Sequence, residues 1–139
     1  MTPDEFVERF NRLFSWEDRY RYLIQLGRKL DPYPEEFRND EHLVPGCASR
    51  VWLVADEGSQ PSQVVLKADS DAHIVKGLIA VLLIMYSGKT AQEILTADVE
   101  GLFERLDLGQ HLSVSRRNGF YSMNRKIREY SAQALTDVG

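Results

Sequence analysis

The stretch AHIVKGLIAVLLIMY, residues 72–86, decides the fold because it predicts a helix that is stable only in the middle of a molecule. From Leu78 onward its side chains are apolar nearly all round, and a helix with no polar face belongs in a core. The longest apolar run, residues 78–86, falls well short of the roughly 20 residues that span a bilayer. We therefore expect a buried central helix in a protein that does not cross a membrane.

The residues just before this helix predict a β-hairpin. Residues 50–55 are rich in β-branched and aromatic side chains, and residues 62–68 alternate their apolar side chains between two faces. The segment 56–61 contains a glycine and a proline and predicts the turn between the strands. After the hairpin, Asp71 is the simplest N-cap for the central helix.

Helical periodicity recurs on both sides of the hairpin and the central helix. The expected helix caps are Thr2 (in a capping box with Glu5), Ser15, Thr90 (in a capping box with Glu93), Asp98 and Ser115. The expected core faces of the first, second and last helices are Phe6, Val7, Phe10, Leu13 and Phe14; Trp16, Tyr20, Leu23, Ile24 and Leu30; and Phe120, Met123, Ile127, Tyr130 and Ala134. This order indicates one α+β domain over residues 1–139, with a small antiparallel β-sheet packed against several helices.

Composition narrows the class of protein. The 139 residues are 43% hydrophobic and 27% charged, which is typical of a globular domain, and the net charge of −4 disfavours nucleic acid as a partner. A single cysteine excludes a disulfide framework within one chain and favours a reducing compartment. The acidic start MTPDEFVERF lacks the basic region and apolar core of a signal peptide, so we expect a cytoplasmic protein.

The only cysteine, Cys47, lies in the segment VPGCAS, residues 44–49, in a loop just before the hairpin. A lone cysteine is most often a small buried hydrophobe. Here Gly46 permits unusual backbone angles beside the thiol, and the small residues after it leave room for another molecule's atoms. Arg50 lies three residues on, where it could stabilise the thiolate, the nucleophilic form. These features make Cys47 a candidate nucleophile.

Other kinds of site have weaker support. The histidines His42, His73 and His111 have no spacing that indicates a metal site or a Cys-His-Asp hydrolase, and we expect no metal. The basic residues of the last helix are most simply a solvated face. Arg116 and Arg117 differ from the rest because they stand at the helix start, where positive charge opposes the helix dipole. This position indicates a further role for the pair.

Two segments carry a resemblance to a known family, LVPGCASRVWLV (residues 43–54) and ADSDAHIVKGLIAVLL (residues 68–83). Three further stretches agree with it: WEDRYRYLIQLGRKL, LTADVEGLFERLDLGQHLSVSR and RNGFYSM. Together they resemble the SufE/CsdE family of sulfur-acceptor proteins, which work with cysteine desulfurases in iron–sulfur cluster assembly. The resemblance covers residues 10–130. Family proteins often carry Gln or Glu after the cysteine, where this chain has Ala48.

The resemblance implies an α+β fold similar to the iron–sulfur scaffold proteins of the IscU type, with the family's cysteine at Cys47. It implies that Cys47 takes sulfur as a persulfide from a SufS/CsdA-like cysteine desulfurase, that the chain stimulates this enzyme, and that the sulfur is relayed onward. The pyridoxal-phosphate cofactor would belong to the desulfurase, so this chain needs no cofactor. The chain would be a sulfurtransferase-like acceptor rather than a stand-alone enzyme. An iron–sulfur scaffold complex is a further partner, and a homodimer is an option.

The resemblance also carries Asp71, His111 and Arg116 over as accessory or partner-facing residues, which join Gly46 and Arg50 in the candidate site. Two alternatives stay open. The chain could be a non-catalytic regulator that binds the desulfurase and does not use its thiol, or a CsdE-like relay to tRNA or cofactor modification. A cysteine hydrolase is a distant third.

Chemistry adds one expectation about the resting protein. A persulfide that is exposed would be lost to any small thiol, so we expect Cys47 to be partly shielded by the hairpin and the central helix. Docking would then have to move the loop outward. Gly46 is the expected pivot, because it tolerates backbone angles that are closed to other residues.

Overall fold

The computed structural model describes residues 1–55, 60–86 and 88–136. In chain order its helices and strands are α1 (Pro3–Arg12), α2 (Trp16–Arg28), η1 (Glu35–Phe37), η2 (Asp40–His42), β1 (Val51–Ala55), β2 (Leu66–Ser70), α3 (His73–Tyr86), α4 (Ala91–Thr96), α5 (Val99–Arg105), α6 (Leu108–His111) and α7 (Val114–Thr136), where η marks a 3-10 turn. The predicted α+β class, with a small antiparallel sheet among helices, is confirmed. In the described ranges, no helix has the length and apolar character needed to cross a membrane.

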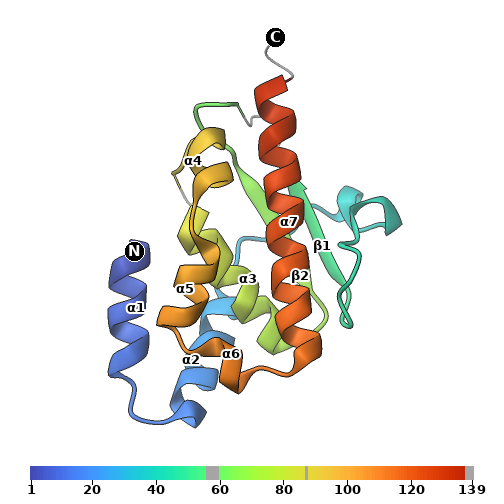
Figure 1. Ribbon diagram of the computed structural model, residues 1–139. Coiled ribbons are helices and arrows are strands. Elements are labelled where there is room, and N and C mark those ends of the chain that lie inside the picture. The colour runs from blue at the N-terminus through green and yellow to red at the C-terminus, as the bar shows by residue number, and fades with distance from the viewer. Residues whose placement is uncertain (56–59, 87, 137–139) are drawn as a thin grey trace.

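The core forms around α3, as the sequence predicts. An unbroken run from Leu78 to Leu82 is buried, and α3 contacts α1, α2, β2 and α7. Figure 1 shows α3 behind the long helix α7, which runs across the molecule in front of the sheet. Phe120, Met123 and Ile127 of α7 are buried against this centre, as their spacing predicts.

The crossing of α2 and α3 is a close helix packing that depends on two glycines. A Cβ atom placed on Gly27 would lie 2.7 Å from the backbone nitrogen of Gly77. A Cβ atom on Gly77 would collide with the carbonyl oxygen of Leu23. Both neighbours are backbone atoms, which cannot turn aside as a flexible side chain can. The two helix backbones therefore approach each other only because both side chains are absent.

The sheet differs from the prediction in its second strand. Strands β1 and β2 are antiparallel, with Val51 opposite Ser70 and Ala55 opposite Leu66. The second strand was expected at residues 62–68, and this boundary is wrong. Gln60 and Gln63 exchange backbone hydrogen bonds of 2.9 and 3.0 Å, which form a tight turn before the ladder begins. The rest of the predicted turn, residues 56–59, lies outside the described residues.

Most expected helix caps are confirmed. Ser15 and Asp98 accept from the backbone amides of Asp18 and Gly101, and Thr90 forms the predicted capping box with Glu93. At the first helix only half of the predicted box forms, because Thr2 accepts from the amide of Glu5 while the Glu5 side chain is exposed and does not bond back.

Two expectations about helix ends are wrong. Ser115 does not cap α7, because Ser113 Oγ accepts from the amide of Arg116 at 3.1 Å and starts the helix two residues earlier. Phe14 is not part of a buried helical face. Helix α1 ends at Arg12, and Phe14 lies fully exposed in the connection to α2.

Gly77→Ala tests the dependence on close helix packing. We expect the free energy of unfolding to fall by about 1–3 kcal/mol, as for other overpacked cores, because α2 and α3 must move apart. Urea denaturation measures this change. Gly109→Ala is the matched control, since its added Cβ would lie 3.4 Å from Phe103, at ordinary contact distance. Equal effects of the two substitutions would contradict a special role for this crossing.

Candidate functional site

The loop that carries Cys47 is closed at its base by the first strand. The amide of Val44 donates to the carbonyl of Val51 at 2.8 Å, and Leu43 bridges to Trp52. Inside the loop, Gly46 has a φ of +85°, in the left-handed region that favours glycine. A Cβ atom on Gly46 would also lie 2.6 Å from Ser122 Oγ of α7. The loop backbone therefore fits this position only with glycine, as expected for the residue before the thiol.

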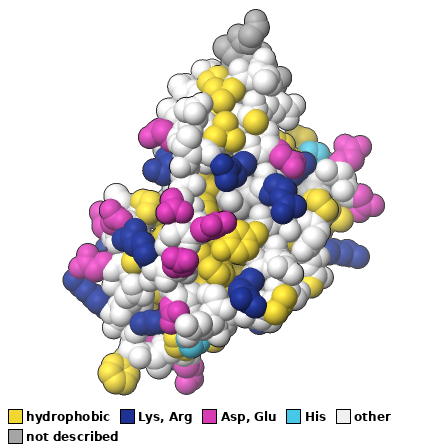
Figure 2. Space-filling view, in the orientation of Figure 1, with side chains coloured by type: hydrophobic (Ala, Val, Ile, Leu, Met, Phe, Trp, Pro, Cys, Tyr) yellow, Lys and Arg dark blue, Asp and Glu magenta, His cyan; other side chains and the backbone are white. Residues whose placement is uncertain are grey.

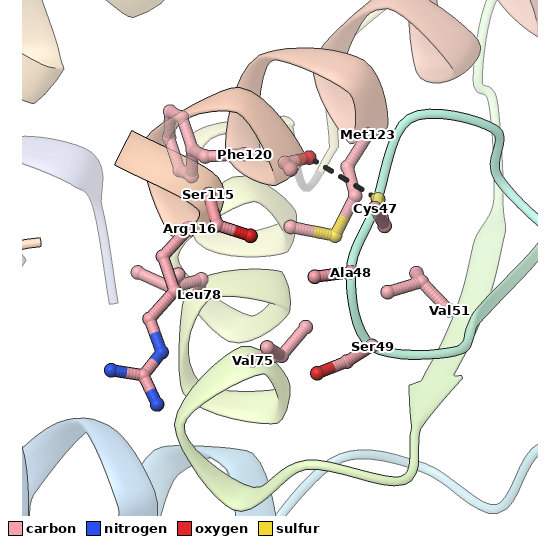
Figure 3. A pocket seen from close by; sticks show the side chains of 11 residues that line it. Cys47, Ala48, Ser49, Val51, Val75, Leu78, Ser115, Arg116, Phe120 and Met123 are labelled. Atoms are coloured by element: carbon pink, nitrogen blue, oxygen red, sulfur yellow. Dashed lines mark hydrogen bonds between the residues drawn. The ribbon is translucent and has the colours of Figure 1, made fainter. Parts of the chain in front are cut away.

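Cys47 lies beside a small cavity of about 30 Å³ between the loop, α3 and α7. Its lining residues are Cys47, Ala48, Ser49, Val51, Val75, Leu78, Ser115, Arg116, Gly119, Phe120 and Met123. Figure 3 shows the loop on one side, Val75 and Leu78 of α3 on another, Met123 of α7 beside the thiol, and Phe120 farther from it. The space is sufficient for one or two water-sized atoms.

The thiol itself is half-buried and has one weak polar contact. Its sulfur lies 3.6 Å from the carbonyl oxygen of Gly119, to which the S–H can donate. Burial raises the pKa of Cys47, and among the described residues no charged group offsets this effect. In the resting conformation the thiol is therefore held in its protonated, less nucleophilic form. The partial shielding expected from the sequence agrees with this geometry, although the contribution of α7 was not foreseen.

Arg50 and Asp71 meet at the end of the loop, but not in the way the sequence suggested. The amide of Arg50 donates to Asp71 Oδ1 at 3.1 Å, while the carbonyl of Arg50 accepts from Ser70 Oγ at 2.7 Å and from the amide of Asp71 at 3.3 Å. Asp71 therefore fastens the loop instead of capping α3. The Arg50 side chain is exposed and has no effect on the pKa of Cys47, so its expected stabilisation of the thiolate is not seen.

Arg116 lines the cavity at the first turn of α7. Its side chain is exposed, and Figure 3 shows the guanidinium pointing away from Cys47. Within the residues that the structure describes, this guanidinium makes no hydrogen bond or ion pair. It is thus a positive group at the rim of the cavity with no internal partner.

His111 lies outside this group. Its ring stacks on Trp16 with 3.7 Å between centroids, and Nε2 lies 3.7 Å from Asp107 Oδ2. Its carbonyl oxygen accepts a hydrogen bond from the hydroxyl of Tyr20. No histidine is among the lining residues of the cavity, so the described part of the chain gives no support to a Cys-His-Asp hydrolase.

The described residues also contain no group of three or more His, Cys, Asp or Glu side chains that could hold a metal ion. The basic side chains of α7 are partly used internally: Lys126 pairs with Glu129 at 3.4 Å, and Arg128 donates to the carbonyl of Leu95. Figure 2 shows basic and acidic side chains intermixed over this face of the molecule. Such a surface lacks the single-sign field that binding to phosphate groups requires.

Sequence reasoning missed several members of the cavity. Val75, Leu78, Phe120 and Met123 have the spacing of ordinary core positions on their helices, and the cavity is a small gap in that core. Gly119 gave no signal, although a Cβ atom there would lie 3.6 Å from the sulfur of Cys47. Only tertiary packing brings these residues to the thiol.

This arrangement defines a class of protein: a small α+β domain with one shielded cysteine on a loop and a largely apolar cavity beside it. The family described as "SufE: Fe-S metabolism associated domain" matches residues 4–131, and the chain belongs to this family. Its members are associated with iron–sulfur metabolism.

Two relatives agree with this assignment, and a solved structure shares the fold. An uncharacterized SufE-like protein of Rhizobium etli is 46% identical over 128 residues, covering 91% of this chain and 86% of that protein. A second, from Rhizobium meliloti, is 45% identical over 127 residues, covering 90% and 91%. The solution structure of a hypothetical protein from Thermus thermophilus matches with a TM-score of 0.78 and 20% identity, covering 98% of this chain and 99% of that one. The last comparison shows a shared fold.

The pH dependence of Cys47 alkylation tests the shielded thiol. Because burial raises its pKa, we expect the midpoint of the rate–pH curve to lie above the value of about 8.5 for a free cysteine. The same protein unfolded in urea is the control and should return to the ordinary midpoint. A native midpoint at or below that of free cysteine would mean that a positive group, and not burial, dominates the thiol.

Proposed function

We propose that Cys47 accepts sulfane sulfur from a SufS/CsdA-like cysteine desulfurase and relays it for iron–sulfur cluster assembly. The observation that carries this proposal is the placement of the chain's only cysteine, on a glycine-pivoted loop beside a largely apolar cavity, in a member of the SufE family. A single thiol suits a relay because no second cysteine in the chain can convert the persulfide into a disulfide.

The transfer is a thiol exchange at sulfur. The thiolate of Cys47 attacks the terminal sulfur of the desulfurase persulfide, a new S–S bond forms at Cys47, and the desulfurase thiolate leaves. The proton released by Cys47 balances the one taken up by the departing thiolate, so no oxidant or reductant is needed. The pyridoxal phosphate that generates the persulfide belongs to the desulfurase, and this chain needs no cofactor or metal of its own.

Shielding of the thiol makes loop movement part of the proposal. In the resting loop the sulfur faces Gly119, and the buried thiol is protonated, so in-line attack on a partner's persulfide is blocked. Docking moves the segment between Val44 and Arg50 outward, with Gly46 as the pivot. After transfer the loop returns and the cavity shelters the added sulfur from small thiols.

The other candidate residues have distinct parts in this proposal. Asp71 and Arg116 are partner-facing, because both are exposed near the loop. His111 keeps only a peripheral role, since its ring is used against Trp16. Reversing the charge of Asp71 or Arg116 should alter affinity for the desulfurase, and unaltered affinity in a folded variant would remove that residue from the interface.

A second candidate function is a regulator that reshapes the desulfurase without using its thiol, and the exposed Asp71 and Arg116 suit such docking equally well.

The final acceptor of the sulfur, either an iron–sulfur scaffold or a CsdE-like path to tRNA or cofactor modification, is a further branch of the proposal. A reducing compartment such as the cytoplasm suits a free thiol. Self-association into a homodimer stays a prediction, which sedimentation at several concentrations would test.

Mass spectrometry tests the relay directly. After incubation with a desulfurase and cysteine, we expect the intact mass to increase by the mass of sulfur and to revert with a reductant. Cys47→Ser is the control variant and should gain none. If the desulfurase is demonstrably persulfidated while this protein stays unchanged, the relay is wrong. Stimulation of the desulfurase that survives in Cys47→Ser would favour the regulator.

Alkylation in the docked complex tests loop movement. We expect iodoacetamide to modify Cys47 faster when the protein is bound to a desulfurase whose own cysteine has been replaced, because docking exposes the thiol. The free protein at the same concentration is the reference. If free Cys47 already reacts as fast as an unstructured thiol, the loop has no closed state to open.

A further inference from the structure

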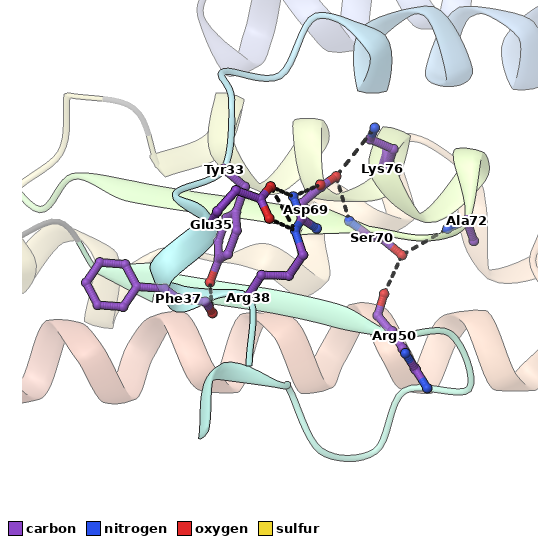
Figure 4. Close-up of polar contacts among 9 residues, drawn as sticks. All are labelled: Tyr33, Glu35, Phe37, Arg38, Arg50, Asp69, Ser70, Ala72 and Lys76. Atoms are coloured by element: carbon purple, nitrogen blue, oxygen red, sulfur yellow. Dashed lines mark hydrogen bonds and ion pairs between the residues drawn. The ribbon is translucent and has the colours of Figure 1, made fainter. Parts of the chain in front are cut away.

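We infer that Arg38 is a positioning residue for the Cys47 loop: its contacts with Asp69 of β2 hold the loop in the closed, thiol-shielding conformation. The inference rests on the proposed function in that closure matters for sulfur transfer, but the contacts and their test concern the isolated protein. Figure 4 shows Arg38, in the segment after α2, beside Asp69 of β2 and Lys76 of α3.

Arg38 is held from several directions. Its Nη2 lies 2.9 Å from Asp69 Oδ2 and 3.1 Å from Glu35 Oε1. Its guanidinium carbon lies 4.8 Å from the ring centroid of Trp52 and 5.3 Å from that of Tyr33, within cation–π distance. The side chains of Arg38 and Asp69 are only 28% and 19% exposed, so this ion pair is screened less by water than a surface pair.

Asp69 is the centre of the group. Its Oδ1 accepts from the amide of Ser70 at 2.8 Å and lies 3.4 Å from Lys76 Nζ of α3. Burial alone would raise the pKa of Asp69, but the Ser70 amide, Arg38 and Lys76 outweigh it, and the net pKa is lowered. At neutral pH the carboxylate is therefore charged and bound to three groups from three parts of the chain.

The next residue connects this group to the loop. Ser70 is buried, its hydroxyl donates to the carbonyl of Arg50 at 2.7 Å, and the same oxygen accepts from the amide of Ala72 at 3.2 Å. The Asp69 carboxylate accepts a hydrogen bond from the amide of Ser70, and this bond helps to set the orientation of Ser70. A continuous series of polar contacts thus runs from Arg38 through Asp69 and Ser70 to Arg50, the last residue of the loop.

Arg38 also acts on the other end of the loop. Its guanidinium lies against the ring of Trp52, and Trp52 forms a β-bridge with Leu43, where the loop begins. Arg38 lies only a few residues before Leu43, so its attachment to β2 fixes the strand-like entry into the loop. Both ends of the loop therefore depend on contacts of the Arg38 guanidinium. Loss of this group should weaken the attachment of both ends together.

The test uses Arg38→Ala with Lys67→Ala as the matched control. Lys67 also joins β2 to the segment after α2, through a 3.1 Å ion pair with Asp31, but it pairs with Val54 at the far end of the sheet from the loop. We expect iodoacetamide to modify Cys47 about tenfold faster in Arg38→Ala, equivalent to about 1.4 kcal/mol in the opening equilibrium. Lys67→Ala should stay within about twofold of the original protein, since a change of this size is small on that scale.

Two further measurements separate positioning from general destabilisation. Amide hydrogen exchange should quicken in residues 43–50 of Arg38→Ala and stay unchanged in the buried part of α7, whereas a merely structural role would raise both. Arg38→Lys keeps the charge but loses the planar group, so it should rescue part of the closure. If Arg38→Ala does not fold, Asp69→Asn carries the same test, because it removes the charge that Arg38 contacts.

The inference is overturned if a folded Arg38→Ala variant, or Asp69→Asn where Arg38→Ala does not fold, leaves both the alkylation rate and exchange in residues 43–50 unchanged. It is also overturned if exchange quickens equally in α7. These outcomes are independent of the relay: Cys47 can fail to accept sulfur while Arg38 still closes the loop, and the relay can operate if Arg38 proves irrelevant to closure.

Discussion

The backbone contact between α2 and α3 is the constraint on which the rest of the structure depends. Gly77 lies on α3 between Val75 and Leu78, so the turn of helix that touches α2 on one side lines the thiol's cavity on another. A displacement of α3 by even one side-chain radius would alter that cavity, because packed cores transmit such shifts. The site is therefore built on a rigid helix pair, although its reactive atom lies on a loop.

The shielding of Cys47 sets two requirements against each other. In the proposed relay burial would protect an added sulfur, but burial also raises the pKa of Cys47 and so favours the protonated thiol, which is the weaker nucleophile. A rigid site cannot satisfy both. A loop with a glycine in the left-handed region, held at both ends by hydrogen bonds, would satisfy each requirement in a different conformation, as the proposed loop movement requires.

Particular elements show which parts of the fold and of the candidate site can be predicted from the sequence. The apolar character of residues 78–82 places α3 correctly, because a helix without a polar face that is too short to span a bilayer belongs in a core. Local signals failed where a short-range contact competes with them: the turn between Gln60 and Gln63 delays β2, and Ser113 starts α7 ahead of Ser115. Cys47 and Gly46 could be selected from sequence, but the α7 side of the cavity could not, since its residues have the pattern of any core helix.

The polar group around Asp69 joins parts of the chain that lie outside the Cys47 loop. Segments 33–38 and 66–76 are distant in sequence and supply the charges of this partly buried cluster, and Trp52 of β1 lies against the Arg38 guanidinium. Removing one member leaves another charge without its partner in a place that water reaches poorly. The loss of one contact therefore destabilises the whole cluster. In the closure that we infer, the loop is held from outside the cavity, so the cavity beside Cys47 can keep its largely apolar lining.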